Sequence, residues 1–382
     1  MEKIILKGIT WGHSRGLLPL QAYAQRFNEL NPEVEIVWKK RTLQEFADFP
    51  IEELTKSYDL LIIDHPWVGC AAATSCVLPL DRHLPKEYLI NQQENQVGRS
   101  HDSYFFGGHQ WALAIDAATP VASYRKDLFE KNKTLIPDTW SGVLELAKAG
   151  KVAAPAIPID LLMNFYMFCQ FHGQIPFQSD REVVDHYTGL KALETMRGFY
   201  GLLDPQFFNA NPIKVAEIMS SSDDYWYCPF AYGYSNYSRP GYARNILTYG
   251  NLVKYKDNQR LRSTLGGTGL AVSEFSANKD WALKYAQEIV SESNQIHEYT
   301  ANGGQPGHRK AWLDERNNLL TQNFFSNTIQ TLDESFIRPR YHGYLHFQDH
   351  AGDPIRDFLM GKLDADAVLE KVDKIYKKSK NV

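Results

Sequence analysis

The apolar positions near the amino terminus alternate between strand-like runs and a helical spacing. Residues 4–9 form a short apolar run, IILKGI. Over residues 17–30 the apolar side chains recur every three or four positions, which places them on one face of a helix. A second strand is predicted from Val34, and the run LLII at 60–63 is typical of a strand buried on both faces of a sheet. This succession predicts an α/β fold.

The rest of the chain opens a second α/β unit and closes with helices. An apolar stretch at 112–129 is followed by Pro137-Asp138-Thr139-Trp140, which is typical of a capped helix start. Between residues 225 and 242 the periodicity is lost, and regular structure is expected again at 262–272. Further helices are predicted at 161–170, 187–202, 213–220, 279–291, 310–320, 353–360 and 364–378.

Length, composition and charge exclude several classes of protein. The 382 residues exceed the about 100–200 of a typical domain, so we expect two domains. Hydrophobic residues at 43% and charged residues at 23% indicate a globular protein. The net charge of −4, without long runs of one sign, gives no indication of nucleic-acid binding. No stretch approaches about 18 uninterrupted apolar residues, so we expect no membrane-embedded segment.

The cysteines and the amino terminus bear on the compartment. The four cysteines, at 70, 76, 169 and 228, form no CxxC pair, so we expect free buried thiols. The start MEKIILKGIT lacks the basic region and the about 7–15-residue apolar core of a secretory signal. If the sequence is complete, this predicts a cytoplasmic protein.

Five sequence segments, spread over nearly the whole chain, carry a resemblance to a known protein family. They are AYAQRFNELNPEVEI (22–36), YDLLIIDH (58–65), ALAIDAATPVASYRKDLF (112–129) with PDTW (137–140), LGGTGLAVS (265–273) and NGGQPGHRKAW (302–312). In order and spacing the chain resembles the family 1 extracellular solute-binding proteins of ABC importers, the carbohydrate-binding group that includes maltose-binding protein.

The resemblance implies a two-lobe, type II periplasmic-binding-protein-like fold. Each lobe would hold a mostly parallel sheet flanked by helices, and a hinge would join them. The first lobe would be 1–112 with 266–308, the second 113–265 with 309–382, and the ligand cleft would lie between them. The resemblance also implies a periplasmic or extracellular monomer that binds a small polar solute, without cofactor or catalysis, and passes it to an ABC permease.

Ligands of α/β sheets lie beyond the carboxyl ends of the strands, so the loop after the first strand is a candidate site. Backbone N–H groups at a helix start favour an anion or a hydroxyl there. Arg15 adds a two-pronged donor for a carboxylate or phosphate. The alternative is a glycine-bounded turn with a surface arginine and a packing tryptophan. The candidate ligand-binding residues of this loop are Trp11, His13, Ser14 and Arg15.

The loop after the third predicted strand and the first crossing between lobes supply further candidates. Asp64 can accept hydrogen bonds from two sugar hydroxyls, and the indole of Trp67 can stack on a pyranose; His65 lies between them. Asp116 and Thr119 lie where the chain first crosses, and matching positions of the family often contact solute. Capping and hinge roles are the alternatives for these residues.

The segment between 225 and 242 holds eight aromatic residues among eighteen. With no strand or helix period, such a density predicts a flat platform for a sugar, and Trp226, Tyr227 and Tyr232 are the candidates. The alternative is a loop packed on its own aromatic rings.

Two glycine-containing segments complete the predicted site. The run at 266–269 lacks the spacing of a phosphate-binding loop and is interpreted as the return crossing, where Gly267 and Thr268 would approach the ligand. His308 follows a glycine-rich loop that reaches the cleft in the family, and the alternative is an exposed loop histidine.

Metal and catalytic sites are not predicted. His342, His346 and His350 recur every four residues, which would suit a metal on a helix, but Gly343 and Pro339 argue against a helix there. No GxSxG motif and no obvious Cys–His pair is present. Together with these observations, the resemblance implies a non-catalytic binding protein for a sugar, a sugar acid or another small carboxylate. A sugar-active enzyme and a cytoplasmic small-ligand sensor are the alternatives.

Overall fold

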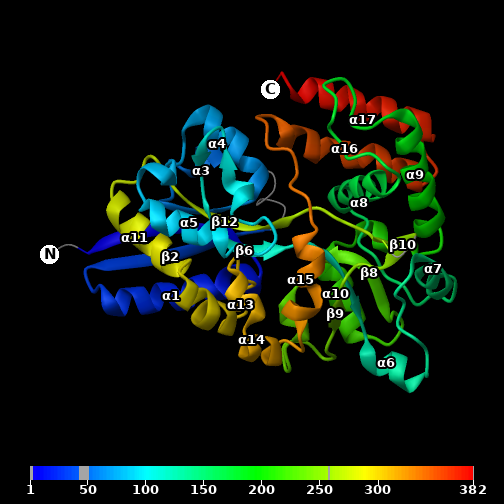
Figure 1. The fold of residues 1–382 in the computed structure, drawn as a ribbon, viewed down its shortest axis with the longest axis horizontal. Coiled ribbons are helices and arrows are strands. Elements are labelled where there is room, and N and C mark those ends of the chain that lie inside the picture. The colour runs from blue at the N-terminus through cyan, green and yellow to red at the C-terminus, as the bar shows by residue number, and fades with distance from the viewer. Residues whose placement is uncertain (1–2, 43–50, 257–258, 382) are drawn as a thin grey trace. The chain divides into compact units, whose positions relative to one another are not determined.

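The computed structural model describes residues 3–42, 51–256 and 259–381, and its chain divides into two compact units (Figure 1). Unit 1 consists of Met1–Ala118, Leu265–Leu319 and Arg340–His342. Unit 2 consists of Thr119–Thr264, Leu320–Pro339 and Gly343–Val382.

Three segments and one further residue lie in a different unit from the one we predicted. Residues 113–118, 309–319 and 340–342 and Leu265 belong to unit 1, whereas the sequence analysis placed them in the second lobe. The reason for the first is strand pairing: Leu113–Ala118 pairs with Gly266–Val272 in the sheet of unit 1.

Unit 1 is built on a five-stranded mixed sheet of order β2-β1-β3-β12-β6. The strands are β1 (Ile4–Trp11), β2 (Val34–Arg41), β3 (Leu60–Ile63), β6 (Leu113–Ala118) and β12 (Gly266–Val272). β1 runs parallel to β2 and β3, whereas β12 runs antiparallel to β3 and β6. The carboxyl ends of β1, β3 and β6 and the amino end of β12 therefore share one edge. We call it the C-edge; it is marked by Trp11, Ile63, Ala118 and Gly266.

Helix α1 (Ser14–Leu30) follows the predicted periodicity. The Nδ1 atom of His13 accepts a hydrogen bond from the backbone N–H of Arg15 and so caps the first turn. The buried face includes Leu20 and Phe27, and Phe27 packs edge-on against Tyr285 of α11 (Lys279–Ile289) with ring centroids 5.3 Å apart. This buried face is what the three- and four-residue spacing predicted.

The helices of unit 1 are α1, α3 (Ile51–Leu54), α4 (Val68–Thr74), α5 (Lys86–Glu94), α11 (Lys279–Ile289), α12 (Glu292–Asn294), α13 (Arg309–Leu313) and α14 (Glu315–Leu320). Short 3-10 turns occupy His65–Trp67, Leu80–Arg82 and Asp102–Tyr104, and a π-helical turn occupies Gln295–Tyr299. The strands β4 (Phe105–Phe106) and β5 (His109–Gln110) form a small hairpin.

Unit 2 contains a three-stranded antiparallel sheet of order β8-β7-β9. Its strands are β7 (Pro120–Tyr124), β8 (Tyr227–Tyr232) and β9 (Thr248–Gly250). The resemblance implied a mostly parallel sheet in this lobe, whereas the three strands of this sheet pair antiparallel. The expectation of irregular structure at 227–232 is also wrong, since pairing with β7 makes this tyrosine-rich segment a strand.

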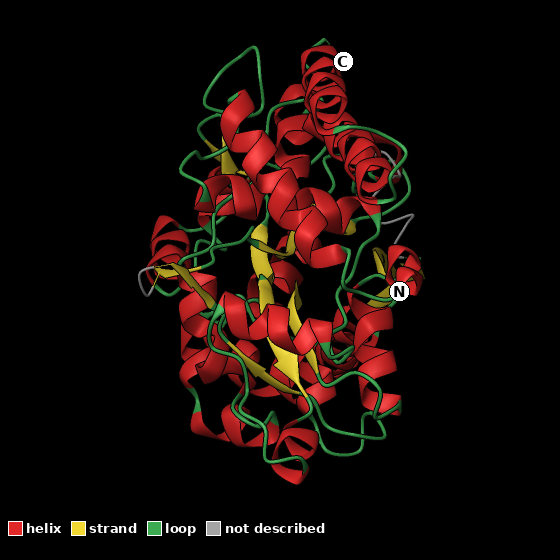
Figure 2. Ribbon diagram, turned by 90° about the vertical axis from the view of Figure 1, so that its right-hand side faces the viewer, coloured by secondary structure: helices red, strands yellow, loops and turns green. Residues whose placement is uncertain are grey.

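The helices of unit 2 are α6 (Lys126–Lys131), α7 (Trp140–Lys148), α8 (Pro158–Phe171), α9 (His186–Tyr200), α10 (Pro212–Ser221), α15 (Phe324–Asp333), α16 (Tyr344–Leu359) and α17 (Ala365–Ser379). Figure 1 shows the long helices α8, α16 and α17 lying together, and α16 packs against both others. Figure 2 shows the structure from the side, with the C terminus that follows α17 marked. Two 3-10 turns, Pro205–Asn209 and Ser235–Ser238, and the short pair β10 (Lys254–Lys256) and β11 (Gln259–Arg260) complete the unit.

Helix α16 begins nine residues earlier than the predicted start at 353. Gly343, which we took as evidence against a helix, has a φ of 90° and lies immediately before the first turn. Pro339 lies outside the helix. Both residues are therefore compatible with a helix that contains His346 and His350.

Two further expectations concern the cysteines and the membrane. All four cysteines are buried and free, as predicted. Within the described parts of the chain, no helix combines the length and the apolar character that crossing a membrane requires.

Candidate functional site

A buried ion pair forms the centre of the C-edge of unit 1. Arg15 extends from the first turn of α1, and Asp116 lies near the end of β6. The Nε atom of Arg15 donates to Oδ2 of Asp116 at 2.8 Å, and Nη2 donates to Oδ1. Both residues are 3% exposed. The guanidinium thus holds a carboxylate of the protein itself in the two-pronged geometry that we had expected for a ligand anion.

The electrostatics of this pair follow from its burial. Burial raises the pKa of Asp116 above its ordinary value, and the charge and hydrogen bonds of Arg15 oppose that shift. Tyr299 is close enough to both groups to interact with their charges, and its own pKa is raised, first by burial and then by Asp116. The two charges balance each other within unit 1.

An aromatic stack adjoins the ion pair. The rings of Trp11 and His13 lie parallel with centroids 5.6 Å apart, and the guanidinium of Arg15 lies 5.7 Å from the centre of the Trp11 ring. Burial and the neighbouring charge of Arg15 lower the pKa of His13 to about 4. His13 is therefore a neutral hydrogen-bond acceptor at neutral pH. Ser14, the first residue of α1, is half-buried.

The loop after β3 is organised by a capping carboxylate. Oδ1 of Asp64 accepts the backbone N–H of His65 at 2.8 Å and caps the short turn that contains Trp67. The His65 ring is fully buried and meets Tyr104 edge-on, with centroids 6.4 Å apart. The Asp64 side chain is 21% exposed, whereas Trp67 is buried at 7%. Asp64 therefore combines a capping role with access to solvent.

Strand β12 brings its first residues against Asp116. Thr268 is the direct strand partner of Asp116, and Gly267 has a φ of 96°. A Cβ atom on Gly267 would lie 2.3 Å from the carbonyl oxygen of Asp116, so only glycine fits at this position. The close contact of Gly267 is thus with another backbone segment of the protein, whereas we had predicted a close approach to the ligand.

Gln305 belongs to the same edge and was not among our candidates. Its Nε2 donates to the carbonyl of Ala117 at 2.9 Å, and the N–H of Ala117 donates to the carbonyl of Gln305 at 2.9 Å. The sequence analysis singled out the surrounding NGGQPGH loop but chose its histidine. Tyr299 was also not among our candidates, and it lies outside every helix that the sequence analysis predicted.

His308 lies away from the C-edge. The loop passes Asp116 at Pro306 and then runs along β6, so that His308 pairs with Gln96 through the backbone. Its ring is buried, and Nε2 lies 3.9 Å from a carboxylate oxygen of Glu292. The structure therefore separates His308 from the other candidate residues of unit 1.

Within unit 2, the side chains of Thr119 and Tyr232 both contact Thr264. The Thr119 hydroxyl donates to the carbonyl of Thr264 at 3.1 Å, and the Tyr232 hydroxyl lies 2.8 Å from the hydroxyl of Thr264. Thr119 and Thr264 are the residues at which the chain enters and leaves this part of unit 2.

The three proposed platform residues do not lie together. Tyr232 is the strand partner of Pro120, whereas Tyr227 is the partner of Tyr124, so Trp226 and Tyr232 lie at opposite ends of β8. Six residues of extended chain separate them by about 20 Å. Tyr227 is 1% exposed and stacks on Tyr124 with centroids 6.4 Å apart. The prediction of a single aromatic platform is therefore wrong. Residues that are close in sequence lie far apart in space here, because the strand between them is extended.

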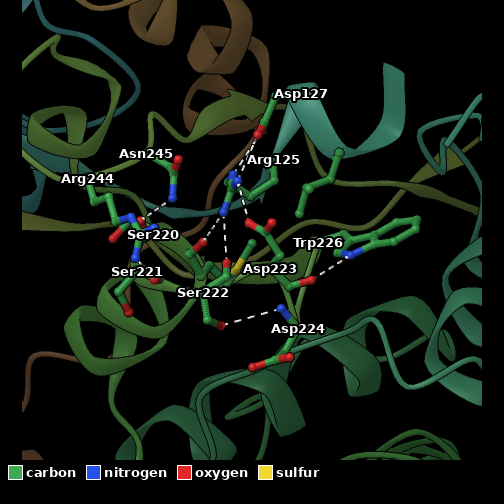
Figure 3. A network of polar contacts seen from close by, with 12 residues as sticks. Arg125, Asp127, Ser220, Ser221, Ser222, Asp223, Asp224, Trp226, Arg244 and Asn245 are labelled. Atoms are coloured by element: carbon green, nitrogen blue, oxygen red, sulfur yellow. Dashed lines mark hydrogen bonds and ion pairs between the residues drawn. The ribbon is translucent and has the colours of Figure 1, made fainter. Parts of the chain in front are cut away.

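A polar network surrounds Arg125 at the Trp226 end of β8 (Figure 3). Nε and Nη2 of Arg125 donate to the two carboxylate oxygens of Asp127, and Nη2 also donates to Asp223 at 2.9 Å. Nη1 donates to the carbonyls of Met219 and Ser222. All five N–H donors are used within unit 2, so this cluster ties the start of α6 to the end of α10 and to the residues that follow it.

Neither unit offers the ligand set of a multidentate metal site. Over residues 3–42, 51–256 and 259–381, no group of three or more histidine, cysteine, aspartate or glutamate residues is arranged to hold a metal ion.

Comparison with known proteins identifies solved structures that share this fold. No family model matches the sequence. The maltose-bound MalE3 of T. maritima superposes over 98% of this chain and 99% of its own, with a TM-score of 0.85 and 17% identity. An ABC transporter solute-binding protein from Agrobacterium radiobacter K84, in complex with ribitol, covers 99% of each chain with a TM-score of 0.81 and 17% identity.

A third structure extends the range of ligands. The ABC substrate-binding protein Lmo0181 from Listeria monocytogenes, in complex with cycloalternan, covers 100% of both chains with a TM-score of 0.81 and 14% identity. The chain described here has the two-lobe α/β fold of the carbohydrate-binding solute-binding proteins of ABC transporters.

Proposed function

We propose that this protein binds a neutral sugar or polyol at the C-edge of unit 1 and serves as the solute-binding component of an ABC-type importer. The observation that carries the proposal is the convergence of polar and aromatic groups from four separate segments. The converging residues are Trp11, Arg15, Asp64, Asp116 and Thr268. Carboxylates, a guanidinium and a hydroxyl bind ligand hydroxyls, and an indole packs on the apolar face of a sugar ring.

The charge balance favours a neutral ligand over a sugar acid. Arg15 was the main argument for an acidic group, but its guanidinium holds Asp116. Asp64 adds a further carboxylate at the same edge. The charges of Arg15 and Asp116 therefore compensate each other, and Arg15 no longer argues for an anionic ligand.

The ligands of the compared proteins support this class of solute. Their structures contain maltose, ribitol and cycloalternan, which are a disaccharide, a polyol and a cyclic oligosaccharide. The importer role rests on the fold shared with these proteins. Its partners would be a membrane permease with its ATPase, and the bound solute would leave chemically unchanged.

The test is a binding screen of the purified full chain. Thermal shift against monosaccharides, oligosaccharides, polyols and uronates identifies ligands, since a ligand at about 100 times its Kd stabilises the folded state by about 2.7 kcal/mol. Calorimetry then gives the Kd of each hit, and mass spectrometry compares the hit before and after incubation. We expect a neutral sugar or polyol to bind and to be recovered unchanged.

Paired variants locate the site. Asp64→Asn keeps an oxygen that can cap the turn but removes the charge, and we expect it to weaken binding at least tenfold. Asp280→Asn is the control, because Asp280 is an exposed carboxylate in the first turn of α11, which follows the opposite end of β12. Equal affinities of the two variants would exclude the C-edge as the site, exclusive binding of uronates would overturn the neutral class, and conversion of the ligand would indicate an enzyme.

A further inference from the structure

Helix α16 (Tyr344–Leu359) presents two histidines one turn apart in unit 2. His346 and His350 are four residues apart, so their side chains project from the same face of the helix. Their rings lie with centroids 4.4 Å apart and planes inclined by 37°. His350 is exposed and His346 is half-exposed, so both rings can be reached from solvent.

The hydrogen bond of His350 sets the tautomer of its ring. Nδ1 lies 2.7 Å from the backbone carbonyl oxygen of His346. A carbonyl oxygen can only accept, so Nδ1 carries the proton and Nε2 carries the lone pair. A histidine that ligates a metal commonly donates its other N–H to a carbonyl in this way, which fixes the ring and increases the basicity of the ligating nitrogen.

The surroundings of the two histidines include a cationic group on the neighbouring helix α17. Lys378 is the cationic group near this face, and its charge opposes a bound cation.

We propose that His346 and His350 form a two-histidine site for a nitrogen-preferring divalent transition ion, such as Ni²⁺, Cu²⁺ or Zn²⁺. Metal–nitrogen bonds of about 2.0–2.1 Å to neighbouring positions of one ion require the two rings to lie within about 5 Å of each other. The centroid separation of 4.4 Å meets this requirement. Water completes the coordination, and imidazole ligands select these ions over Ca²⁺ and Mg²⁺.

Other histidines of the chain provide matched controls. His297 makes the same local contact as His350, because its Nδ1 lies 2.8 Å from the carbonyl oxygen of Ser293, four residues earlier. A serine stands there in place of a second histidine. His186 is exposed and lies 2.7 Å from a carboxylate oxygen of Asp366, so it tests a histidine–carboxylate pair as the alternative site.

The experiment is calorimetric titration of the full chain with NiCl₂ in a buffer that does not bind metal. We expect one site in the parent protein. His346→Gln and His350→Gln should each weaken it at least tenfold, because a single imidazole remains, whereas His297→Gln and His186→Gln should leave its affinity unchanged. Circular dichroism without metal checks that α16 remains folded in each variant, and the exposed position of His350 makes its variant the safer of the two.

A spectroscopic measurement identifies the ligands directly. With one equivalent of Cu²⁺, the electron paramagnetic resonance spectrum should show coupling to two nitrogens in the parent and to one in His350→Gln. Two results would overturn the proposal: no Ni²⁺ binding by the folded parent protein, or binding that survives both glutamine variants of α16. Loss of binding in His186→Gln alone would also do so.

Discussion

Arg15 and Asp116 are 101 residues apart in the sequence and form a buried two-pronged ion pair at the end of the unit 1 sheet. The pair joins the first turn of α1 to the end of β6. Asp116 is also the strand partner of Thr268 in β12. Three segments that are distant in sequence therefore meet at Asp116, at the proposed ligand site.

Removing one partner of this pair should destabilise the protein strongly. We expect Arg15→Ala to lower the free energy of unfolding by about 3–5 kcal/mol, because it leaves the Asp116 carboxylate buried and uncompensated. Urea denaturation of the full chain measures the loss. Arg26→Ala is the control: its ion pair with Glu29 is more than half exposed, and about 0–1 kcal/mol is expected. Equal losses in the two variants would contradict the structural role of the pair.

The buried histidines of unit 1 should make its stability fall in mild acid. Burial lowers the pKa of His13 and of His101 to about 4 each, and the unfolded value is near 6.5. Between these values the unfolded chain binds more protons than the folded chain, so stability decreases as the pH falls from about 6.5 toward 4. The expected loss is about 1 kcal/mol per histidine at pH 5.5.

The variant His13→Asn tests this assignment. Asparagine retains an acceptor for the N–H of Arg15 but does not titrate, so the variant should lose less stability than the parent between pH 7.5 and 5.5. Urea unfolding at both pH values gives the comparison, and pH 7.5 is the internal control. Parallel pH profiles of parent and variant would show that His13 is not responsible.

Asp160 should have the opposite pH dependence. It lies in the first turn of α8, is 6% exposed, and its Oδ2 has no hydrogen-bond partner among the described residues. Burial raises the pKa of Asp160 to about 8. The unfolded carboxyl releases its proton near pH 4 whereas the folded one retains it, so stability decreases as the pH rises from about 4 to 8.

Replacement of Asp160 by asparagine should remove this penalty. We expect Asp160→Asn to be more stable than the parent at pH 7 by on the order of 1–4 kcal/mol, and the difference should disappear near pH 4. Thermal unfolding across this pH range measures it. Asp353→Asn, at an exposed position of α16, should change stability by less than about 0.5 kcal/mol. A destabilised Asp160→Asn at pH 7 would mean that the carboxylate has a favourable partner.

Gly267 and Gly108 form a matched pair for the packing of the C-edge. Both have positive φ, 96° and 86°. A Cβ atom on Gly267 would clash with the carbonyl of Asp116, whereas one on Gly108 would meet nothing within 4 Å. The free-energy cost of placing an alanine at a positive φ is therefore common to both variants, and the steric clash is specific to Gly267.

We accordingly expect Gly267→Ala to lose at least 1 kcal/mol more stability than Gly108→Ala, since overpacking typically costs about 1–3 kcal/mol. It should also weaken solute binding, because the clash displaces Asp116. Urea unfolding and calorimetry with the identified solute measure the two effects. Equal stability of the two variants would show that β12 moves freely relative to β6.

Elements with an uninterrupted local signal were predicted closely. The run LLII matches β3 residue for residue, and the buried face of α1 follows its spacing. Both predictions depend on the periodicity of apolar residues, which is a local property of the sequence. The start of α16 and the strand β8 were missed because their local sequences are ambiguous. A glycine before a helix and a tyrosine-rich segment have several local interpretations, and packing selects among them.

The candidate site was predicted in part. The sequence indicated the loops after β1 and β3 because strand ends of a parallel arrangement meet at one edge. It could not indicate that Arg15 binds Asp116 in place of a ligand anion. Nor could it separate Trp226 from Tyr232, since the length of an intervening strand becomes a distance only once the strand has formed.

The sequence by itself determined the α/β class, the division into two units in outline, the free cysteines and the loops that carry polar residues, because hydrophobic periodicity and local spacing encode these features. Only the tertiary structure decided the strand directions, the membership of 113–118 in unit 1 and the partner of each buried charge. These features depend on contacts between segments far apart in the chain, and a local pattern does not record which distant segment satisfies a buried group.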